Sequence, residues 1–407
     1  MPNVLFVRNG TPGRFTFIAK ALIERGWRAA LINPPEGADL QGVETVRWHT
    51  SRFSAKGIYD PATRAEADII RGRAAADSAL QLRARGFQPD LIIGNPGWGE
   101  VAFLGEVFPN AKKILIGEFY YRSQGTDAGF DPEFETFSFD DQVKASAKNA
   151  VLAMCYAEAD RIVVPTPFQA SLFPTIFQSR ITIIHEGIDT ARADRRPNVA
   201  FRLPSGRLLG ADKPIITFVN RVFEPMRGFH IFMRALPLVQ REIPEAEVLL
   251  IGADHPAGYG KPALTASTWK EYMLREVGGR LDQDHVHFTG TISYDQLISA
   301  FSISTAHVYW TYPFVLSWSL LDAMACECLV IGSDTAPVRD VLTNKNGLLI
   351  DFFDHEALAS NLTLSCKHPE RFQAQRRAAR ETILHAYDRK SVCEPRWLGV
   401  IEEVMRG

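Results

Sequence analysis

The sequence predicts an α/β protein built from two doubly wound parallel-sheet domains. Short buried strands alternate with helical patterns, the alternation stops once near the middle of the chain, and it then restarts with a similar rhythm. Such alternation is typical of a parallel sheet that is covered by helices on both faces. The 407 residues are enough for two or three domains.

The first half contains six apolar runs of strand length, separated by helical patterns such as TFIAKALIERGW. Apolar runs without polar alternation are typical of strands that are buried on both faces. The predicted strands are VLFVR (4–8), AALIN (29–33), LIIGN (91–95), KILIGEF (113–119), RIVVP (161–165) and ITIIHEG (181–187).

Residues 190–213 interrupt this pattern, since they are rich in Arg, Pro and Gly and have no periodicity. We interpret them as a linker. We expect an N-terminal domain over 1–195, a C-terminal domain over 196–388, and a last helix over 389–407 that returns to the N-terminal domain. The strands predicted after the linker are PIITFVN (214–220), AEVLLIG (246–252), VHFTGT (286–291), HVYW (307–310), LVIGSD (329–334) and LLIDF (348–352).

The composition excludes several classes of protein. Hydrophobic residues make up 46% of the chain and charged residues 23%, as in soluble globular proteins. The net charge of -2 gives no general affinity for nucleic acid. No apolar run reaches the roughly 20 residues of a membrane helix, and MPNVLFVRNG lacks the pattern of a signal peptide. Five cysteines without a disulfide spacing favour the reducing cytoplasm.

Glycines and arginines follow the first strand of each predicted domain. Gly10 and Gly13 precede a helix, where a turn can hold a phosphate or a sugar, although a purely structural turn is equally consistent. Arg221 and Arg227 follow the first strand of the second domain, and two guanidinium forks can hold a diphosphate from two sides. Exposed surface arginines are the alternative. Parallel sheets bind ligands beyond the carboxyl ends of their strands, so we expect a site for two substrates in the cleft between two such sheets.

The segment YPFVLSWSLLDAMACECLVIGSD (312–334) predicts a ligand site in the same domain. Ser317 or Ser319 can cap a short helix, and Leu320, Leu321 and Met324 form its inward face. The free amides of a helix start attract anions.

Aromatic and acidic residues gather after two strands of the first domain. Aromatic rings cover the C–H faces of sugars, and carboxylates accept hydrogen bonds from sugar hydroxyls. A core tryptophan and a structural acid are the alternative, and His185 fits a packed or capping residue better than a general base. The candidate residues are Trp98, Glu100, Glu118, Tyr120, Tyr121 and Arg122.

The chain resembles glycosyltransferase family 4, the retaining enzymes of the GT-B fold. The resemblance covers nearly the whole sequence. In the second half it rests on RVFEPMRGFHIFMRALPLV, EVLLIG, VHFTGTIS, PFVLSWSLLDAMACECLVIGSD and NGLLIDFFD. In the first half, GTPGRF, NPGWGE, EFYYRSQGTDAGFDPEF and IIHEGID look like one bacterial branch of the family.

The resemblance implies a nucleotide-sugar donor in the second domain and an acceptor in the first. Arg221 and Arg227 match the family's Arg and Lys that neutralise the diphosphate. Asp322 matches the second acid of the E-x7-E motif, which holds ribose hydroxyls, whereas Phe314 replaces the first acid. Glu118 stands where the family often has a histidine. The implied catalytic residues are Arg221, Arg227 and Glu118; the implied donor-binding residues are Gly13, Ile292, Phe314, Val315, Leu316, Ser317 and Asp322; and the implied acceptor-binding residues are Trp98, Glu100, Tyr120, Tyr121 and Arg122.

The resemblance therefore predicts a metal-independent, retaining glycosyltransferase of the hexosyltransferase type. It implies no cofactor, a UDP- or GDP-sugar as co-substrate, a carbohydrate, glycolipid or small-molecule acceptor, and a role in glycolipid or polysaccharide synthesis. A non-catalytic sugar-nucleotide-binding subunit and a sugar-nucleotide epimerase are the alternatives. The expected location is the cytoplasm or the inner face of the membrane. A helix that carries several arginines is better explained as a solvated face than as a membrane contact; these arginines are Arg64, Arg71, Arg73, Arg83 and Arg85.

Overall fold

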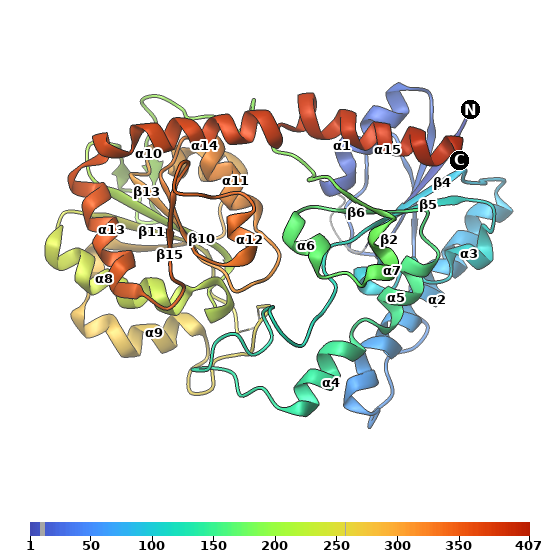
Figure 1. The fold of residues 1–407 in the computed structure, drawn as a ribbon, viewed down its shortest axis with the longest axis horizontal. Helices are drawn as coiled ribbons and strands as arrows, with labels where there is room; N and C mark the ends of the chain where they lie inside the picture. Colours follow the sequence, from blue (N-terminus) through green and yellow to red (C-terminus); the bar gives the residue numbers. More distant parts are fainter. Residues whose placement is uncertain (9–12, 257) are drawn as a thin grey trace. The chain divides into compact units, whose positions relative to one another are not determined.

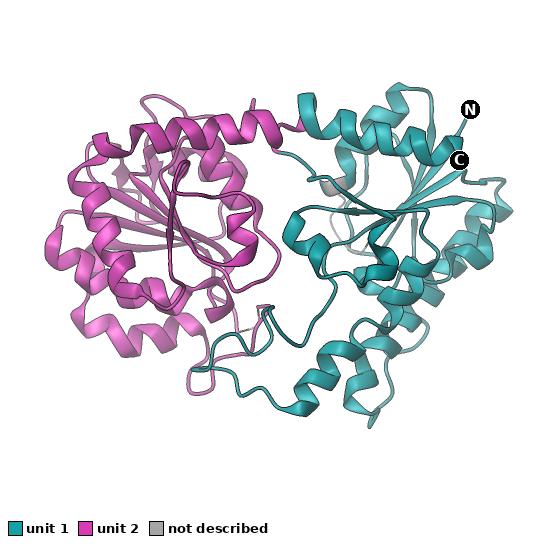
Figure 2. Ribbon diagram, in the orientation of Figure 1, with its two compact units in different colours: residues 1–187, 390–407 teal, residues 188–389 magenta. Residues whose placement is uncertain are grey.

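The computed structural model describes residues 1–8, 13–256 and 258–407, which form two compact units (Figures 1 and 2). Unit 1 comprises residues 1–187 and 390–407, and unit 2 comprises residues 188–389. No helix among the described residues is both long and apolar enough to cross a membrane. A five-residue π-helix, Arg389–Cys393, spans the boundary between the units.

Unit 1 contains a parallel sheet whose strands, within the described residues, follow the order β3-β2-β1-β4-β5-β6-β7. The order reverses between β1 and β4, where Val4 lies opposite Leu91. The strands are β1 (Asn3–Val7), β2 (Arg28–Asn33), β3 (Glu44–Arg47), β4 (Leu91–Gly94), β5 (Lys112–Ile116), β6 (Arg161–Val164) and β7 (Ile181–Ile183).

Helices cover both faces of this sheet because successive strand side chains point to opposite faces. Val4 and Phe6 pack with Trp397 in one core, and Leu5 packs with Leu82 in the other. The first core is covered by α1 (Gly13–Glu24) and α15 (Glu394–Arg406), and the second by α2 (Thr63–Ala84), α3 (Leu104–Val107) and α5 (Ala150–Ala157). The remaining helices of the unit are α4 (Phe139–Ala147), α6 (Pro167–Ser171), α7 (Thr175–Gln178) and the 3-10 turns η1 (Asp60–Ala62) and η2 (Pro96–Trp98).

Unit 2 repeats the plan with a six-stranded parallel sheet, within the described residues, in the order β12-β11-β10-β13-β14-β15. Here the order reverses between β10 and β13, where Ile216 lies opposite Ala306. The strands are β10 (Ile215–Val222), β11 (Glu247–Ala253), β12 (Val286–Gly290), β13 (Ala306–Tyr309), β14 (Val330–Ser333) and β15 (Leu348–Ile350).

Two groups of helices enclose the sheet of unit 2. On one side Phe232 of α8 stacks on Phe218 of β10, with 4.6 Å between the ring centroids. On the other side Phe301, Leu321 and Ile383 pack into one core with Val330. The helices are α8 (Phe229–Glu242), α9 (Trp269–Val277), α10 (Tyr294–Ile303), α11 (Trp318–Ala325), α12 (Ala336–Arg339), α13 (His355–Lys367) and α14 (Gln373–Ala386), with 3-10 turns η3 (Pro225–Arg227), η4 (Gly278–Arg280), η5 (Gln283–His285) and η6 (Pro369–Phe372).

The structure places a strand at each of the twelve predicted apolar runs and corrects one prediction. Residues 190–213 are not a linker but part of unit 2. There β8 (Phe201–Arg202) pairs antiparallel with β9 (Leu208–Leu209), and the buried side chains of Phe201, Leu203 and Leu209 join a core with Leu249. The few apolar residues of this segment were enough to anchor it, although it lacks any periodicity.

Candidate active site

The two sheets each offer a site at the point where their strand order reverses. At such a point the loops that follow two neighbouring strands leave in opposite directions and open a crevice beyond the strand ends. In unit 2 these loops follow β10 and β13, and in unit 1 they follow β1 and β4. Many of the predicted site residues lie on these loops, whereas Glu118 and Tyr120 to Arg122 follow β5 and Ile292 follows β12.

Arg227 is the best-positioned cation at the reversal point of unit 2. It ends η3 after β10, is only 6% exposed, and reaches the loop that follows β13. Its Nη1 donates hydrogen bonds to Thr311 Oγ1 and to the carbonyl of Val315, both at 2.9 Å. The side chain of Asn220 donates to the Arg227 carbonyl at 3.3 Å. These bonds hold the guanidinium group at the strand ends.

Two aromatic rings flank this guanidinium group. The Cζ atom of Arg227 lies 5.4 Å from the ring centroid of Tyr259 and 5.5 Å from that of Phe314, which are cation–π distances. The two rings lie 5.4 Å apart, and Tyr259 is half exposed whereas Phe314 is buried. Phe314 therefore supports Arg227 and offers no carboxylate to a ligand.

Arg221, the second predicted diphosphate ligand, differs in its surroundings. It lies at the end of β10, one residue before the last of the strand, and its side chain is exposed. Among the described residues it forms neither a hydrogen bond nor an ion pair. The structure thus brings together Arg227, Phe314 and Val315. Arg221 lies at the same strand end, and its guanidinium group makes no polar contact with the part of the chain that the structure describes.

Helix α11 begins directly after this loop, as the sequence predicts. Ser317 is the N-cap and its Oγ accepts a hydrogen bond from the Ser319 amide at 3.4 Å. The Ser317 amide donates to the hydroxyl of Tyr309 at 2.7 Å, so this amide is already engaged. Leu316 packs against the core beneath α11, and Ile292 packs against the β8–β9 core.

Asp322 lies one turn into α11 and is 5% exposed. The hydroxyl of Tyr294 donates a hydrogen bond to its Oδ1 at 2.9 Å. Burial raises the pKa of Asp322 to about 6, although the bond from Tyr294 and the charge of Arg389 act in the opposite direction.

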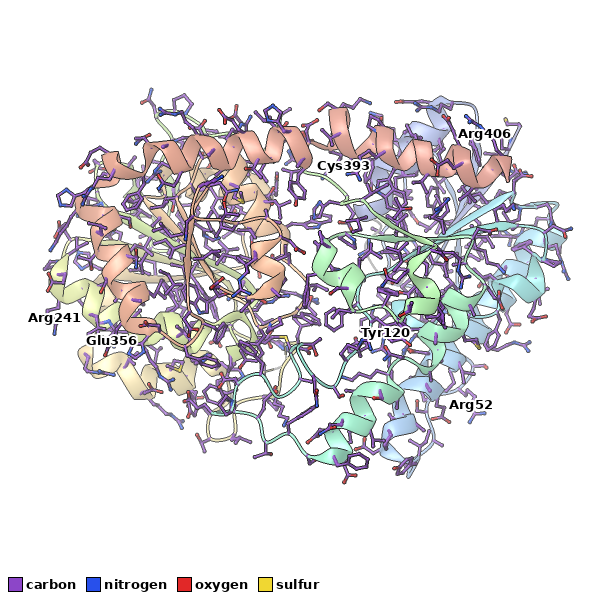
Figure 3. All side chains as sticks on the ribbon, in the orientation of Figure 1. Arg52, Tyr120, Arg241, Glu356, Cys393 and Arg406 are labelled. Carbon is purple, nitrogen blue, oxygen red and sulfur yellow. The ribbon has the colours of Figure 1, made fainter. Side chains whose placement is uncertain are left out.

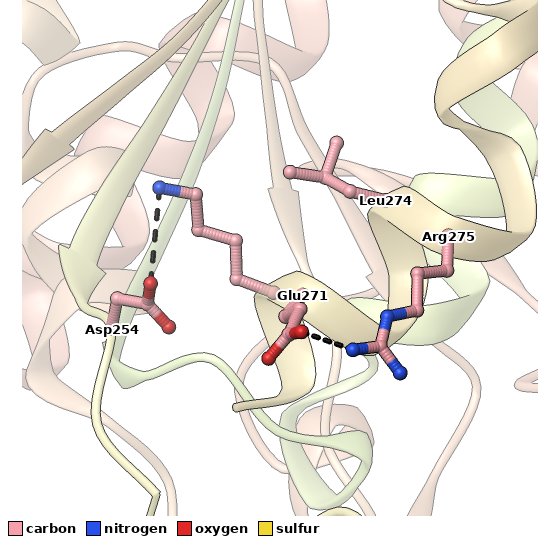
Figure 4. Close-up of a pocket in the computed structure, with 5 residues that line it drawn as sticks. Asp254, Glu271, Leu274 and Arg275 are labelled. Carbon is pink, nitrogen blue, oxygen red and sulfur yellow. Dashed lines mark hydrogen bonds and ion pairs between the residues drawn. The ribbon is translucent and has the colours of Figure 1, made fainter. Parts of the chain in front are cut away.

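A small cavity opens beside the neighbouring strand β11 (Figure 4). Its volume is about 310 Å³, and its lining contains an ion pair between Lys270 and Asp254 with 3.8 Å between Nζ and Oδ2. The other lining residues are Glu271, Leu274 and Arg275. None of the predicted site residues lines this cavity.

In unit 1 the loop after β4 is fixed by α2. Arg64 and Arg71 both pair with the buried carboxylate of Asp68, and each also donates to a backbone carbonyl, of Gly97 and Trp98 respectively. Their guanidinium carbons lie 4.8 Å and 5.7 Å from the ring centroid of Trp98, which is 48% exposed. This arrangement presents the indole ring as a platform.

The arginine-rich face of α2 is thus a clamp on the protein itself rather than a uniformly solvated face. Besides Arg64 and Arg71, Arg83 donates to the Val107 carbonyl at 3.1 Å. Arg73, which pairs with the exposed Asp77, and Arg85, whose side chain is 60% exposed, have the solvated character that the sequence analysis favoured.

The clamp makes a testable prediction for Asp68. Asp68→Asn removes the buried negative charge between the guanidinium groups of Arg64 and Arg71. We expect this change to lower the free energy of unfolding by about 2 kcal/mol. The loss is smaller than that for breaking a fully buried ion pair, because both arginine side chains are partly exposed. Asp77→Asn on the same helix removes an exposed partner and should cost roughly 0.5 kcal/mol or less. Urea denaturation measures both variants, and equal effects would contradict the clamp.

Glu100 is buried beneath the loop that follows β4 and carries Trp98. It is 0% exposed, and neither carboxylate oxygen has a hydrogen-bond partner among the described residues. Burial raises the pKa of Glu100 to about 7, with the charge of Arg71 acting against the shift. Glu100 therefore lies under the loop that carries Trp98 and does not face solvent.

Glu118 follows β5 and is joined to the Trp98 loop by Asn95. The Asn95 amide donates to Glu118 Oε2 at 3.0 Å, and its oxygen accepts from the Gly97 amide at 2.9 Å. The Gln169 side chain donates to the Glu118 carbonyl. The sequence analysis did not include Asn95, although its place directly after a strand could have identified it.

Tyr120, Tyr121 and Arg122 continue from Glu118. Tyr120, labelled in Figure 3, packs on Phe173 with ring centroids 5.4 Å apart, and burial raises its pKa. Burial likewise raises the pKa of Tyr121. Arg122 donates to the Leu172 carbonyl at 2.6 Å.

Two further predictions concern the glycines before α1 and the role of His185. Gly13 is the first residue of α1, and Gly10 lies outside the described residues. Nδ1 of His185 accepts a hydrogen bond from the Gly187 amide at 3.0 Å, in agreement with a structural histidine.

Two doubly wound units of this kind define the GT-B class, and solved structures with the same fold support the assignment. Sucrose-phosphate synthase from Thermosynechococcus elongatus matches with a TM-score of 0.74 and 18% identity over 100% of both chains. Anabaena HepE in complex with UDP and glucose matches with a TM-score of 0.70 and 15% identity over 99% of this chain and 100% of that chain.

Sequence comparisons identify the family. Residues 25–193 match the glycosyl transferase family 4 group, and residues 204–382 match glycosyl transferases group 1. The chain belongs to glycosyltransferase family 4, which confirms the resemblance.

Curated relatives include two phosphatidyl-myo-inositol mannosyltransferases. The protein from Propionibacterium freudenreichii subsp. shermanii is 30% identical over 36% of this chain, and the match spans only 32% of that protein. The protein from Mycolicibacterium smegmatis is 26% identical over 63% of this chain and 67% of its own length.

Proposed function

We propose that this protein transfers a sugar from a nucleotide diphosphate to an acceptor hydroxyl, with retention of the anomeric configuration. Unit 2 binds the donor and unit 1 binds the acceptor. The observation that carries the proposal is the buried Arg227, which hydrogen bonds and flanking rings hold at the strand ends of β10 and β13 beside the start of α11.

Arg227 and Arg221 supply the electrostatic part of the reaction. As the bond between the anomeric carbon and the phosphate oxygen breaks, its electron pair leaves with the diphosphate. A fixed guanidinium group stabilises that charge without reorganisation. In this proposal the two arginines take the role that a metal ion has in other transferases.

The nucleotide of the donor is UDP or GDP in this proposal. HepE was solved with UDP, and a further relative from Mycolicibacterium smegmatis, 24% identical over 56% of this chain, is named as GDP-mannose-dependent. The phosphatidyl-myo-inositol relatives support a lipid-linked acceptor, and with such an acceptor we propose that the reaction takes place in the cytoplasm at the inner face of the membrane. The five buried free cysteines fit a reducing compartment.

A thermal-shift screen with UDP- and GDP-sugars tests the proposal, because a ligand at 100 times its Kd stabilises the folded state by roughly 2.7 kcal/mol. The donor that raises Tm should then support transfer to a phosphatidylinositol or simple sugar acceptor. A nucleotide sugar that binds without any transfer or hydrolysis would favour the non-catalytic alternative. An isomeric nucleotide sugar formed without acceptor would favour the epimerase.

Glu118 is proposed to contact the reacting sugars from unit 1. Glu118→Gln keeps an oxygen that can accept from Asn95 but removes the charge. A charged hydrogen bond is worth about 1.5–3 kcal/mol, so kcat should fall by roughly tenfold to a hundredfold. Steady-state kinetics measure this, with Glu106→Gln on α3 as a control, and full activity of Glu118→Gln would remove the residue from the chemistry.

A further inference from the structure

Glu100 is a buried acid that the proposed reaction does not use. Its side chain is 0% exposed, and within the described residues neither of its carboxylate oxygens has a hydrogen-bond partner. A charged carboxylate without partners is far more costly to bury than a protonated one. The fold around this side chain therefore favours the protonated acid.

The backbone beside Glu100 is pressed against α2. Gly99 has a φ of 92°, a left-handed conformation that favours glycine. A Cβ atom at Gly99 would clash with the backbone of Asp68, and one at Gly72 would lie 2.6 Å from the Gly99 carbonyl oxygen. Because this close contact keeps Glu100 fully buried, water reaches its carboxylate only when the loop moves away from α2.

The cations that act on Glu100 already hold other groups. Arg64 and Arg71 both pair with the carboxylate of Asp68, and each also donates to a backbone carbonyl of the loop that carries Trp98. A guanidinium group that turned to Glu100 would give up part of these bonds. An ionised Glu100 therefore competes with the bonds that fix the loop on α2.

The titratable groups around Glu100 belong to α2 and α5. Burial raises the pKa of Glu100 to about 7, its own backbone amide and the charges of Arg71 and Arg64 act against this shift, and the charge of Asp68 adds to it. Burial also raises the pKa of Cys155 on α5, so this thiol stays neutral. Glu100 thus changes its charge near neutral pH, whereas its neighbour on α5 does not.

We propose that Glu100 is a proton-controlled latch on the loop of residues 96–103, which follows β4 and carries Trp98. While the acid keeps its proton, the loop stays packed on α2 and Trp98 stays fixed as a platform. When the acid releases its proton to solvent, the new charge needs water or a guanidinium group, and both draw the loop away from α2. This goes beyond the proposed function, because it makes the order of the proposed acceptor site depend on pH.

Hydrogen exchange followed by mass spectrometry tests the latch in the full-length protein. The pKa of Glu100 is about 7 with the loop closed and takes its ordinary value of 4.5 once the loop opens, so the closed loop is favoured at low pH and loses this advantage as the pH rises through 7. Opening then becomes roughly twentyfold more favourable between pH 5.5 and pH 7.5. After correction for intrinsic exchange rates, the protection of residues 96–103 should fall by about the same factor.

Glu100→Gln and Glu100→Met remove the titration, because neither new side chain can lose a proton. In both variants the protection of residues 96–103 should change by less than about twofold between the two pH values. Two variants are used because the buried glutamine amide brings polar atoms without partners, whereas methionine is apolar. Glu106→Gln is the matched control, since Glu106 is an exposed acid of the neighbouring α3, and it should keep the wild-type pH dependence.

Two outcomes overturn the inference. Protection of residues 96–103 that is independent of pH in wild type would show that an ionised Glu100 is accommodated without any opening. A fall that persists in a folded Glu100→Gln or Glu100→Met protein would assign the pH dependence to another group, such as Asp68. The experiment contains no substrate, so either result leaves the proposed sugar transfer standing, and a failure to detect transfer leaves the latch standing.

Discussion

Replacing Arg227 by alanine is expected to lower kcat/KM for sugar transfer by about a hundredfold to a thousandfold, the effect of removing one fixed donor from a developing anion. The guanidinium group is positioned before a substrate arrives, because Thr311 and the Val315 carbonyl accept its hydrogen bonds. A flexible lysine cannot reproduce this planar fork, so Arg227→Lys should recover only part of the loss.

Because Arg227 is buried, its replacement can also lower the stability of the fold. Arg221→Ala separates the effect on catalysis from the effect on stability. Arg221 is exposed, and its removal should leave Tm unchanged while lowering kcat/KM by roughly tenfold to a hundredfold. Arg241→Ala is the control, because this residue of α8 lines a different cavity of about 630 Å³ together with Glu356. Figure 3 labels both residues. Wild-type kinetics in Arg221→Ala and Arg227→Ala would contradict the assignment of the donor site.

Gly228→Ala is expected to lower the free energy of unfolding of unit 2 by about 4 kcal/mol, since it combines left-handed backbone strain with overpacking. Gly228 has φ of 66°, and a Cβ atom there would lie 2.6 Å from Cγ of the buried Trp310 and closer still to two of its other atoms. Trp310 cannot retreat easily because its Nε1 donates to the Phe352 carbonyl at 2.8 Å.

Gly279→Ala is the matched control, because a Cβ atom at Gly279 would meet nothing within 4 Å. Urea denaturation followed by circular dichroism measures both variants. A stability of Gly228→Ala within 1 kcal/mol of the control would show that the turn after Arg227 tolerates a side chain. We also expect Gly228→Ala to weaken nucleotide binding, because Gly228 directly follows Arg227 and is the N-cap of α8.

The strands could be predicted because burial on both faces leaves an apolar run that is visible in the sequence. The meeting of Arg227 with Val315 also follows from the sequence, since both lie on loops after strands that neighbour each other in one sheet. The short strand β3, with polar residues at Glu44 and Arg47, carries no such run and was missed.

The contacts between side chains were much harder to predict from the sequence than the strands. Tyr259 lies in a loop far from Arg227 in sequence, and the bond from Tyr294 to Asp322 joins two helices whose packing no local pattern specifies. Glu100 looks like a surface acid beside Trp98, yet the close approach of α2 to the loop buries it. The residues of a site can thus follow from loops and strands, whereas their contacts depend on tertiary packing.

The most direct test of the donor site is a crystal structure with the nucleoside diphosphate, UDP or GDP, that raises Tm. We predict that its phosphates contact the guanidinium group of Arg227 at the strand ends of β10 and β13, with the ribose beside Asp322. Phosphates bound to any other part of unit 2, with Arg227 still bonded only to Thr311 and Val315, would contradict the account.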